Sequence, residues 1–201
     1  IGMIFFNSLM AYPLSRKDYR LRKFLNFYFY FTCLFGGGMV PTYILITQYL
    51  HMADTIWVYI VPSLVSAWTI FYIRASFQQI PEEMIESAVL DGASEWRILM
   101  TFMIPLSKPV LATLALGTFL GKWNDWMTSM LYINDRYELI SLQYLLQRIM
   151  LNIKLLEQNN NDLIDMSNIP GETSRMAMMF VVAGPALVIF PFFQKYFVKG
   201  M

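Results

Sequence analysis

Four stretches of the chain are apolar and contain no Asp, Glu, Lys or Arg. They are Phe24–Ala53, Thr55–Ile73, Pro109–Gly121 and Met176–Gln194. A helix that crosses the hydrocarbon core of a membrane needs about 20 mostly apolar residues. Three of the stretches reach or approach that length, and Pro109–Gly121 does so with its polar neighbours. Because a chain of 201 residues has too little interior to bury them all, the pattern predicts an all-α, polytopic membrane helical bundle.

The same pattern predicts about five membrane spans. Ile1–Leu14 is interpreted as the end of one span, and the others are Phe24–Leu50, Ile56–Ile73, Pro109–Trp126 and Met176–Phe193. The chain starts abruptly in an apolar segment without an initiator Met, so we expect it to be part of a longer protein.

The span predicted at Phe24–Leu50 contains Gly36-Gly37-Gly38 and Pro41. We therefore expect a break or a sharp kink there. Broken helices in transporters often lie near the substrate path, whereas small residues also allow close packing against a neighbouring helix. Both interpretations fit the sequence.

The distribution of Lys and Arg predicts the orientation. Ten of the fifteen fall in three intervals placed in the cytoplasm, which are Ser15–Lys23, Arg74–Lys108 and the end of the chain. Such an excess is typical of short cytoplasmic loops. The polar interval 132–175 is then an external loop, partly helical around Leu139–Leu156. The net charge of +1 gives no indication of a nucleic-acid partner.

The cytoplasmic interval 74–108 contains two short amphipathic helical patterns. The first begins at Pro81, which suits the first turn of a helix, and the acidic residues that follow suit the positive helix end. One face of this helix is apolar and the other acidic. The apolar face carries Ile85, Ala88 and Val89, and the acidic face Glu82, Glu83 and Glu86.

Gly92 predicts the end of the first helix, because glycine reaches left-handed backbone angles without penalty. A second helical pattern follows, with Trp96, Leu99, Met100 and Met103 at helical spacing and Pro105 near its end. Two helices joined by a glycine turn, between two spans, could pass movement from a soluble partner to the membrane. A hairpin that rests on lipid headgroups has the same pattern.

The spacing within this interval resembles the EAA loop of permease subunits of binding-protein-dependent ABC transporters. That pattern is Glu-Ala-Ala, three residues, Gly, nine residues, Ile-x-Leu-Pro. Glu86, Ala88, Gly92 and Pro105 match it directly, and the mild departures are Ser87, Phe102 and Ile104. The neighbouring Leu90–Arg97 and Pro105–Pro109 are similar to the carbohydrate-uptake branch, the relatives of maltose permease.

The resemblance extends over nearly the whole chain. It includes Ala11–Arg16 before the first loop, Phe119-x-x-x-Trp123-Asn124-x-Trp126, and Pro191–Phe197 at the close. The triple glycine and the Met-Ser-Asn stretch at Met166 resemble a subgroup associated with complex, including uronate-containing, oligosaccharides. The resemblance implies one transmembrane permease domain over 1–201 with the ABC importer type I fold. Since members have six spans and a short tail, it also implies that both termini are truncated.

By resemblance, the loop at 74–108 inserts into a cleft on an ATPase subunit. Glu86 would make polar contacts there, Ala88 would permit close approach, and Gly92 would form the elbow. The implied coupling residues are Glu82, Glu83, Glu86, Ala88, Asp91, Gly92, Ala93, Trp96 and Arg97. The implied function is that of a permease subunit in an ATP-driven sugar or oligosaccharide importer, in the bacterial cytoplasmic (inner) membrane.

The resemblance also implies the partners: a homologous second permease subunit, an ATPase subunit dimer, an extracytoplasmic sugar-binding protein and membrane lipid. ATP and Mg would be used by the ATPase. The chain itself has no Gly-rich Lys-Ser/Thr phosphate loop, so we expect no directly bound cofactor and no metal.

Trp123, Asn124, Asp125 and Trp126 are tentative residues of a substrate path. Aromatic faces stack on sugar rings, and amide and carboxylate groups bond to hydroxyls. An interfacial aromatic belt accounts for the tryptophans equally well, and Lys122 and Asp125 have the spacing of a pair on one helix face.

Two other classes are weighed. An intramembrane enzyme has little support, because His51 is the only histidine and no Ser stands in a Gly-x-Ser-x-Gly turn. We therefore expect no catalytic residues. An ion-coupled secondary transporter usually has a larger bundle with repeat symmetry and mid-membrane charges, and the sequence shows neither.

Overall fold

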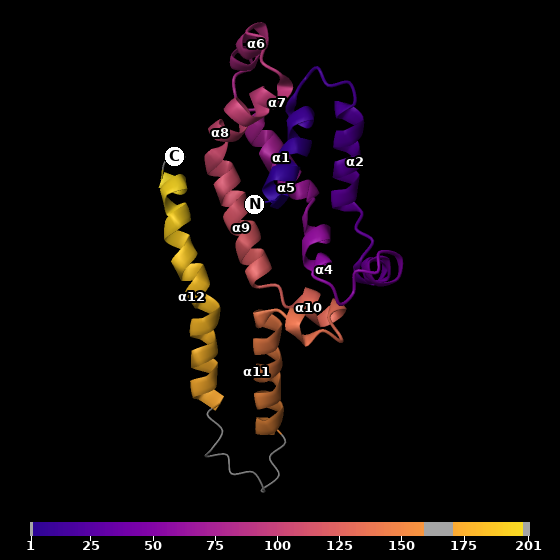
Figure 1. Cartoon of the computed structure of the whole chain (residues 1–201), viewed down its shortest axis with the longest axis vertical. Helices are drawn as coiled ribbons and strands as arrows, with labels where there is room; N and C mark the ends of the chain where they lie inside the picture. The colour runs from indigo at the N-terminus through magenta and orange to yellow at the C-terminus, as the bar shows by residue number, and fades with distance from the viewer. Residues whose placement is uncertain (1, 159–170, 199–201) are drawn as a thin grey trace. The chain divides into compact units, whose positions relative to one another are not determined.

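The computed structural model describes residues 2–158 and 171–198, and within them every regular element is helical (Figure 1). The helices are α1 Gly2–Ser15, α2 Arg22–Leu34, α3 Met39–Ile44, η1 Leu45–Tyr49, α4 Trp57–Ile60, η2 Val61–Ser63, α5 Ala67–Phe77, α6 Glu82–Leu90, α7 Glu95–Ile98, η3 Leu99–Met103, α8 Ile104–Leu106, α9 Lys108–Trp123, α10 Met127–Tyr132, η4 Tyr137–Leu139, α11 Leu142–Gln158 and α12 Gly171–Val198. The predicted all-α class is confirmed. The Met-Ser-Asn stretch at Met166 lies outside the described residues.

The contacts within the chain define two compact units. The first contains α1, α2, α5, α6 to α8 and most of α9; the second contains η1, α10, α11 and most of α12. The interval 74–108 lies wholly in the first unit. That 1–201 forms a single permease domain stays a prediction.

No single helix among the described residues is long and apolar enough to cross a membrane alone. Three pairs of consecutive helices reach the required length and composition together, each bent by more than 40° at a short break. The pairs are Arg22–Leu34 with Met39–Tyr49, Trp57–Ser63 with Ala67–Phe77, and Glu95–Leu106 with Lys108–Trp123. The apolar helix Met176–Pro191 is shorter. Two of the predicted spans, Phe24–Leu50 and Ile56–Ile73, are therefore broken helices by length and composition, whereas the third pair joins α9 to the second half of the interval 74–108.

The break predicted by the triple glycine is confirmed. The chain bends by 109° between α2 and the segment Met39–Tyr49. Gly38 has φ of +84°, a left-handed angle that a residue with a β-carbon rarely adopts. The break thus has a local cause in the sequence.

A second break, at 64–66, was not predicted, and a buried side chain from α1 supports it. Asn7 is 0% exposed. Its Nδ2 donates to the carbonyl of Leu64 at 3.0 Å, and its Oδ1 accepts from the backbone N–H of Ser66 at 2.9 Å. Buried backbone groups need hydrogen-bond partners. Where the helix is interrupted, the Asn7 side chain supplies such partners to the carbonyl of Leu64 and the N–H of Ser66. The Ser66 hydroxyl then caps α5 by accepting from the N–H of Thr69.

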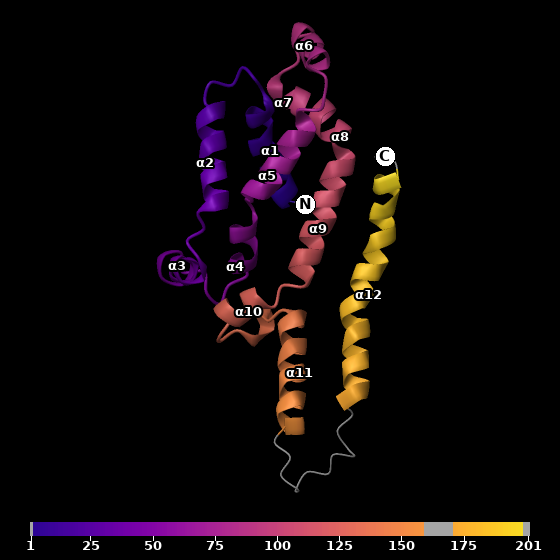
Figure 2. The same cartoon turned by 180° about the vertical axis from the view of Figure 1, so that it is seen from behind.

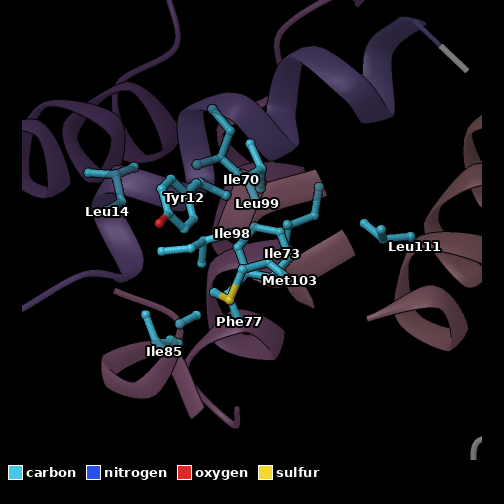
Figure 3. Close-up of a cluster of buried hydrophobic side chains, with 12 residues drawn as sticks. Tyr12, Leu14, Ile70, Ile73, Phe77, Ile85, Ile98, Leu99, Met103 and Leu111 are labelled. Carbon is cyan, nitrogen blue, oxygen red and sulfur yellow. The ribbon is translucent and has the colours of Figure 1, made fainter. Parts of the chain in front are cut away.

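The core of the first unit forms where α1, α5 and the segment α6–η3 meet. Figure 3 shows its side chains converging from these elements. The fully or almost fully buried members are Ala11, Leu14, Ile70, Ile73, Phe77, Ile98, Leu99 and Met103. The helices α6 and α7 contribute to the same core as α1 and α5. The interval 74–108, which is predicted to be cytoplasmic, is therefore packed against α1 and α5.

In the second unit, Asp54 holds two loops together. Its Oδ1 accepts from the backbone N–H groups of Asn134 at 2.8 Å, Asp135 at 2.9 Å and Arg136 at 3.4 Å. These donors hold the pKa of the Asp54 carboxyl below its usual range. The N–H of Asp54 in turn donates to the carbonyl of Tyr132 at 3.0 Å. Asp54 therefore joins the segment before α4 to the start of the interval 132–175, which is predicted to be an external loop.

Candidate coupling site

The coupling hairpin, as we name residues 82–106, begins with α6. Pro81 precedes the helix as its N-cap residue, with φ of −55° and ψ of 131°, one position earlier than predicted. Glu82 and Glu83 occupy the first turn, where negative charge interacts favourably with the helix dipole. The acidic first turn is thus as predicted, whereas Pro81 lies just before the helix and not in its first turn.

The buried face of α6 differs from the prediction at one position. Ile85 and Ala88 are each 6% exposed and belong to the core, but Val89 is 45% exposed. Successive residues of an α-helix are about 100° apart, so Ala88 and Val89 lie on either side of Ile85. The core covers the side of Ala88, and Val89 therefore faces outward.

Gly92 ends α6 in the manner predicted. Its φ is +76°, its N–H donates to the carbonyl of Val89 at 2.9 Å, and the N–H of Ala93 donates to the carbonyl of Ala88 at 3.0 Å. This pair of bonds is the Schellman motif, which closes a helix through a left-handed residue. A β-carbon at position 92 would meet nothing within 4 Å. The requirement for glycine is therefore set by the backbone angle and not by space.

The second half of the hairpin runs continuously through α7, η3 and α8. The Ser94 hydroxyl caps α7 by accepting from the N–H of Arg97 at 3.3 Å. The π-helical turn η3 follows, a rare form often found at functional positions. Ile98, Leu99 and Met103 are buried, whereas the predicted face member Trp96 is 57% exposed. A bend of 77° separates this half from α9.

Both halves of the hairpin contact α1 and the loop after it. The Tyr12 hydroxyl donates a hydrogen bond to the Glu95 carboxylate at the start of α7. The Lys17 ammonium pairs with the Glu82 carboxylate at the start of α6. Figures 1 and 2 show α6, α7 and the α1–α2 connection together at one end of this unit.

These contacts have electrostatic and aromatic components. The hydrogen bond and the charge of Glu82 raise the pKa of the Lys17 ammonium, and Lys17 lowers the pKa of the Glu82 carboxyl. The rings of Phe5 and Trp96 meet edge to face, with centroids 6.4 Å apart. Tyr12 and Lys17 were not predicted as site residues, because no local sequence signal reports a pairing over so many intervening residues.

The opposite face of α6 is exposed and mixed in character. Leu90 is 88% exposed and Met84 42% exposed, and the acidic residues Glu83, Glu86 and Asp91 are exposed beside them. Within the part of the chain that the structure describes, the Glu86 side chain takes part in no hydrogen bond or ion pair. The face of α6 away from the core therefore combines two exposed apolar side chains with acidic ones.

The structure divides the predicted coupling residues into three groups. Glu86, Glu83, Asp91 and Arg97 are exposed. Glu82 and Trp96 contact α1 or its following loop. Ala88 packs into the chain's own core, so its small side chain permits close approach within this protein. A contact between Ala88 and a partner stays a prediction.

The tentative substrate-path residues form the turn between α9 and α10. Trp123 Nε1 donates to the carbonyl of Val182 in α12 at 3.0 Å. Asp125 accepts from the N–H of Thr128 at 3.0 Å and from its hydroxyl at 2.7 Å. The predicted pairing of Asp125 with Lys122 is present at 3.5 Å.

Asn124 is also engaged locally. Its Nδ2 donates to the carbonyl of Leu120 at 2.9 Å, and its Oδ1 accepts from Gln143 Nε2 at 3.2 Å. The polar groups of this turn therefore stabilise the connections among α9, α10 and α11. A contact between these residues and a sugar stays a prediction.

The bent pairs of apolar helices, with the hairpin packed on α1 and α5, fit a polytopic helical membrane protein. The family described as "Binding-protein-dependent transport system inner membrane component" matches residues 3–201. The chain belongs to this family. The match confirms the predicted class, an inner-membrane permease subunit with a helical fold. Members of this class are transport proteins and not enzymes.

Individual relatives agree with the family. Protein LplC of Bacillus subtilis is 37% identical over 201 residues, covering 98% of this chain and 66% of that protein. The polygalacturonan/rhamnogalacturonan transport system permease protein YtcP of Bacillus subtilis is also 37% identical, covering 98% of this chain and 68% of that protein. The chain thus spans about two thirds of the length of these curated relatives.

A solved structure is similar over the whole described fold. It is the crystal structure of a bacterial ABC transporter involved in the import of the acidic polysaccharide alginate. The identity is 27% and the TM-score 0.79, with 98% of this chain and 73% of that chain covered. The resemblance inferred from the EAA pattern is therefore confirmed by both sequence and structure.

Proposed function

We propose that the chain is the transmembrane permease subunit of an ATP-driven importer of sugars or oligosaccharides. Family membership and the similarity to the polysaccharide permease YtcP support this proposal. The observation that carries it is the two-sided coupling hairpin. One side is packed on α1 and α5, and the other presents exposed acidic and apolar residues.

The hairpin suits the transmission of movement. Its outer face, with Glu86 and Leu90, docks on an ATPase subunit, which uses ATP and Mg²⁺. The two ends of the hairpin continue along the chain into α5 and α9, and Tyr12 and Lys17 connect the hairpin to α1. A displacement of α6 by the ATPase would therefore move three membrane helices together and alternate access to the sugar.

Family membership supports the set of partners that we propose. They are an ATPase subunit dimer, a homologous second permease subunit and an extracytoplasmic sugar-binding protein, within membrane lipid. Affinity purification of the full-length protein from native membranes in a mild detergent tests them. The ATPase and a second permease are expected to co-purify with the wild type and with Glu138→Lys, and the ATPase to be lost in Glu86→Lys. Recovery of the permease without any partner in several mild detergents contradicts the proposal.

The substrate class we propose is a uronate-containing oligosaccharide. Two similar proteins are transporters of acidic polysaccharides: YtcP is named for polygalacturonan and rhamnogalacturonan, and the solved transporter is involved in the import of alginate. Uptake of a labelled galacturonate disaccharide by cells with the intact transporter is the direct test. A neutral disaccharide of the same size is the control, and preferential uptake of the neutral sugar would refute this assignment while leaving the importer itself in place.

A further inference from the structure

A cavity of about 420 Å³ lies beside the coupling hairpin in the first unit. It is lined by the loop after α1, by the connection from α5 to α6, and by Met103 of η3. Its volume is within the range of about 300–1,000 Å³ typical of small-molecule pockets. The coupling contacts described above do not account for this space.

Positive charge predominates in the lining. Arg16, Lys17 and Arg22 contribute three cations, and Glu82 contributes one carboxylate, which Lys17 pairs. Arg16 is 4.0 Å from Asp18. Arg22 forms no ion pair among the described residues, so none of them neutralises its charge.

A further arginine adds to the charge near Arg22. Arg74 of α5 carries a further positive charge that Arg22 repels, although Arg74 is not among the residues that line the cavity. Its Nη1 donates to Asn26 Oδ1 at 2.7 Å, but its Nε is buried without a hydrogen-bond partner in the described structure.

The lining of the cavity is amphipathic. Half-buried Ile80 and exposed Pro81 supply an apolar part beside the cations, next to the buried Phe77 and Met103, and Figure 3 shows the latter two in the core. Gln78 and Gln79 add amide groups. The basic loop 15–23 is the one that the positive-inside rule places against the cytoplasmic leaflet, where anionic lipids concentrate.

We propose that this cavity binds the phosphate group of an anionic phospholipid of the cytoplasmic leaflet. The guanidinium groups of Arg16 and Arg22 bond the phosphate oxygens, since arginine binds phosphate in a bidentate manner. The glutamine amides bond the hydroxyls of a glycerol headgroup. The adjoining apolar surface accommodates the start of the acyl chains, which a soluble phosphate lacks. The bound lipid joins the loop after α1 to the start of α6.

Native mass spectrometry of the full-length permease in its complex tests the site, with phosphatidylglycerol and phosphatidylcholine titrated in parallel. The wild type is expected to retain phosphatidylglycerol preferentially. Arg16→Gln/Arg22→Gln should weaken this binding roughly 25-fold, because each cation near a phosphate contributes about fivefold. Arg20→Gln/Lys23→Gln is the matched control, since it removes two charges from the same loop outside the cavity, and its binding should be unchanged.

Three results would overturn the proposal. Equal loss in both double variants would mean a diffuse basic surface. Equal retention of the two lipids by the wild type would mean no anion selectivity. Displacement of phosphatidylglycerol by millimolar inorganic phosphate would mean a site for a soluble anion.

A second measurement needs no variant and is independent of folding effects. A photoactivatable phosphatidylglycerol, with its reactive group near the headgroup, is incorporated with the wild-type complex into nanodiscs and cross-linked. Labelled peptides are expected from residues 15–23 or 77–82. Labelling confined to other segments would contradict the site.

Discussion

The hydroxyl of Tyr12 in α1 donates a hydrogen bond to the carboxylate of Glu95 in α7, across a separation of 83 residues. Tyr12 is 8% exposed, and its ring belongs to the core of the first unit. The chain continues from α1 into α2 and not into the hairpin. Movement of the hairpin therefore reaches α1 through side-chain contacts, of which this bond is one and the pair of Lys17 and Glu82 another.

Tyr12→Phe should weaken the coupling of ATP hydrolysis to sugar uptake while lowering the stability of the protein only slightly. The ring keeps its packing, and the lost bond to an exposed carboxylate costs about 1 kcal/mol of stability after solvent screening. We expect more ATP hydrolysed per sugar transported in proteoliposomes that contain the full-length complex. Tyr19→Phe is the control, because Tyr19 is 38% exposed. An unchanged ratio in Tyr12→Phe would show that α1 is not driven through this bond.

Asn7→Ala should destabilise the first unit. The substitution leaves the backbone N–H of Ser66 and the carbonyl of Leu64 without the side-chain partner they now have. A buried polar group left unsatisfied costs about 1–3 kcal/mol. The measurement is thermal unfolding of the full-length protein in nanodiscs. Ser8→Ala is a matched control, since the Ser8 hydroxyl is equally buried but bonds to the carbonyl of Ile4 within its own helix, and it should unfold almost as the wild type does.

Gly92→Ala should strain the hairpin at its turn. A residue with a β-carbon at a left-handed φ costs roughly 1–2 kcal/mol. Gly92→Asn should cost less, because asparagine tolerates that angle better. Unfolding temperature and coupled uptake are measured for both variants. Equal losses for alanine and asparagine would indicate that something other than the backbone angle requires glycine here.

Asp54→Asn should release the loop at 134–136. The three N–H donors lower the pKa of Asp54, so the ionised clamp is fully formed above the ordinary carboxyl pKa, about 4, and is lost as pH falls through the lowered value. At neutral pH, hydrogen exchange at the amides of Asn134 and Asp135 should be faster in the variant than in the wild type. Asp135→Asn, in the same loop, should leave it unchanged. Identical exchange in Asp54→Asn and the wild type would disprove the clamp.

The sequence predicted the elements whose causes are local. The triple glycine predicted the break after α2, and Gly92 predicted the turn of the hairpin, because both depend on backbone angles that few residues other than glycine adopt. The helix α11 was predicted within a few residues, at Leu139–Leu156 against the observed Leu142–Gln158. The family resemblance rested on the same local spacing.

Features that depend on packing between distant segments were not predicted. Asn7 is an unremarkable polar residue in an apolar stretch until Leu64 and Ser66 are beside it. The outward position of Val89 depends on which side of α6 the core covers, and helical periodicity allows either. The engagement of Asn124 and Asp125 within their own turn likewise required the positions of Thr128 and Gln143.

The most direct test of the account is ATP-driven sugar uptake by the full-length complex in proteoliposomes, compared for the wild type and Glu86→Lys. Glu86 is exposed on the outer face of α6 and unpaired within the described chain, so the substitution should leave the helices inserted. We predict at least about a tenfold fall in uptake, as expected when one partner of an interfacial charged contact is reversed, with ATP hydrolysis no longer linked to transport. Glu138→Lys, in the predicted external loop, should transport normally. Normal uptake by Glu86→Lys would contradict the assignment of the hairpin as the coupling element.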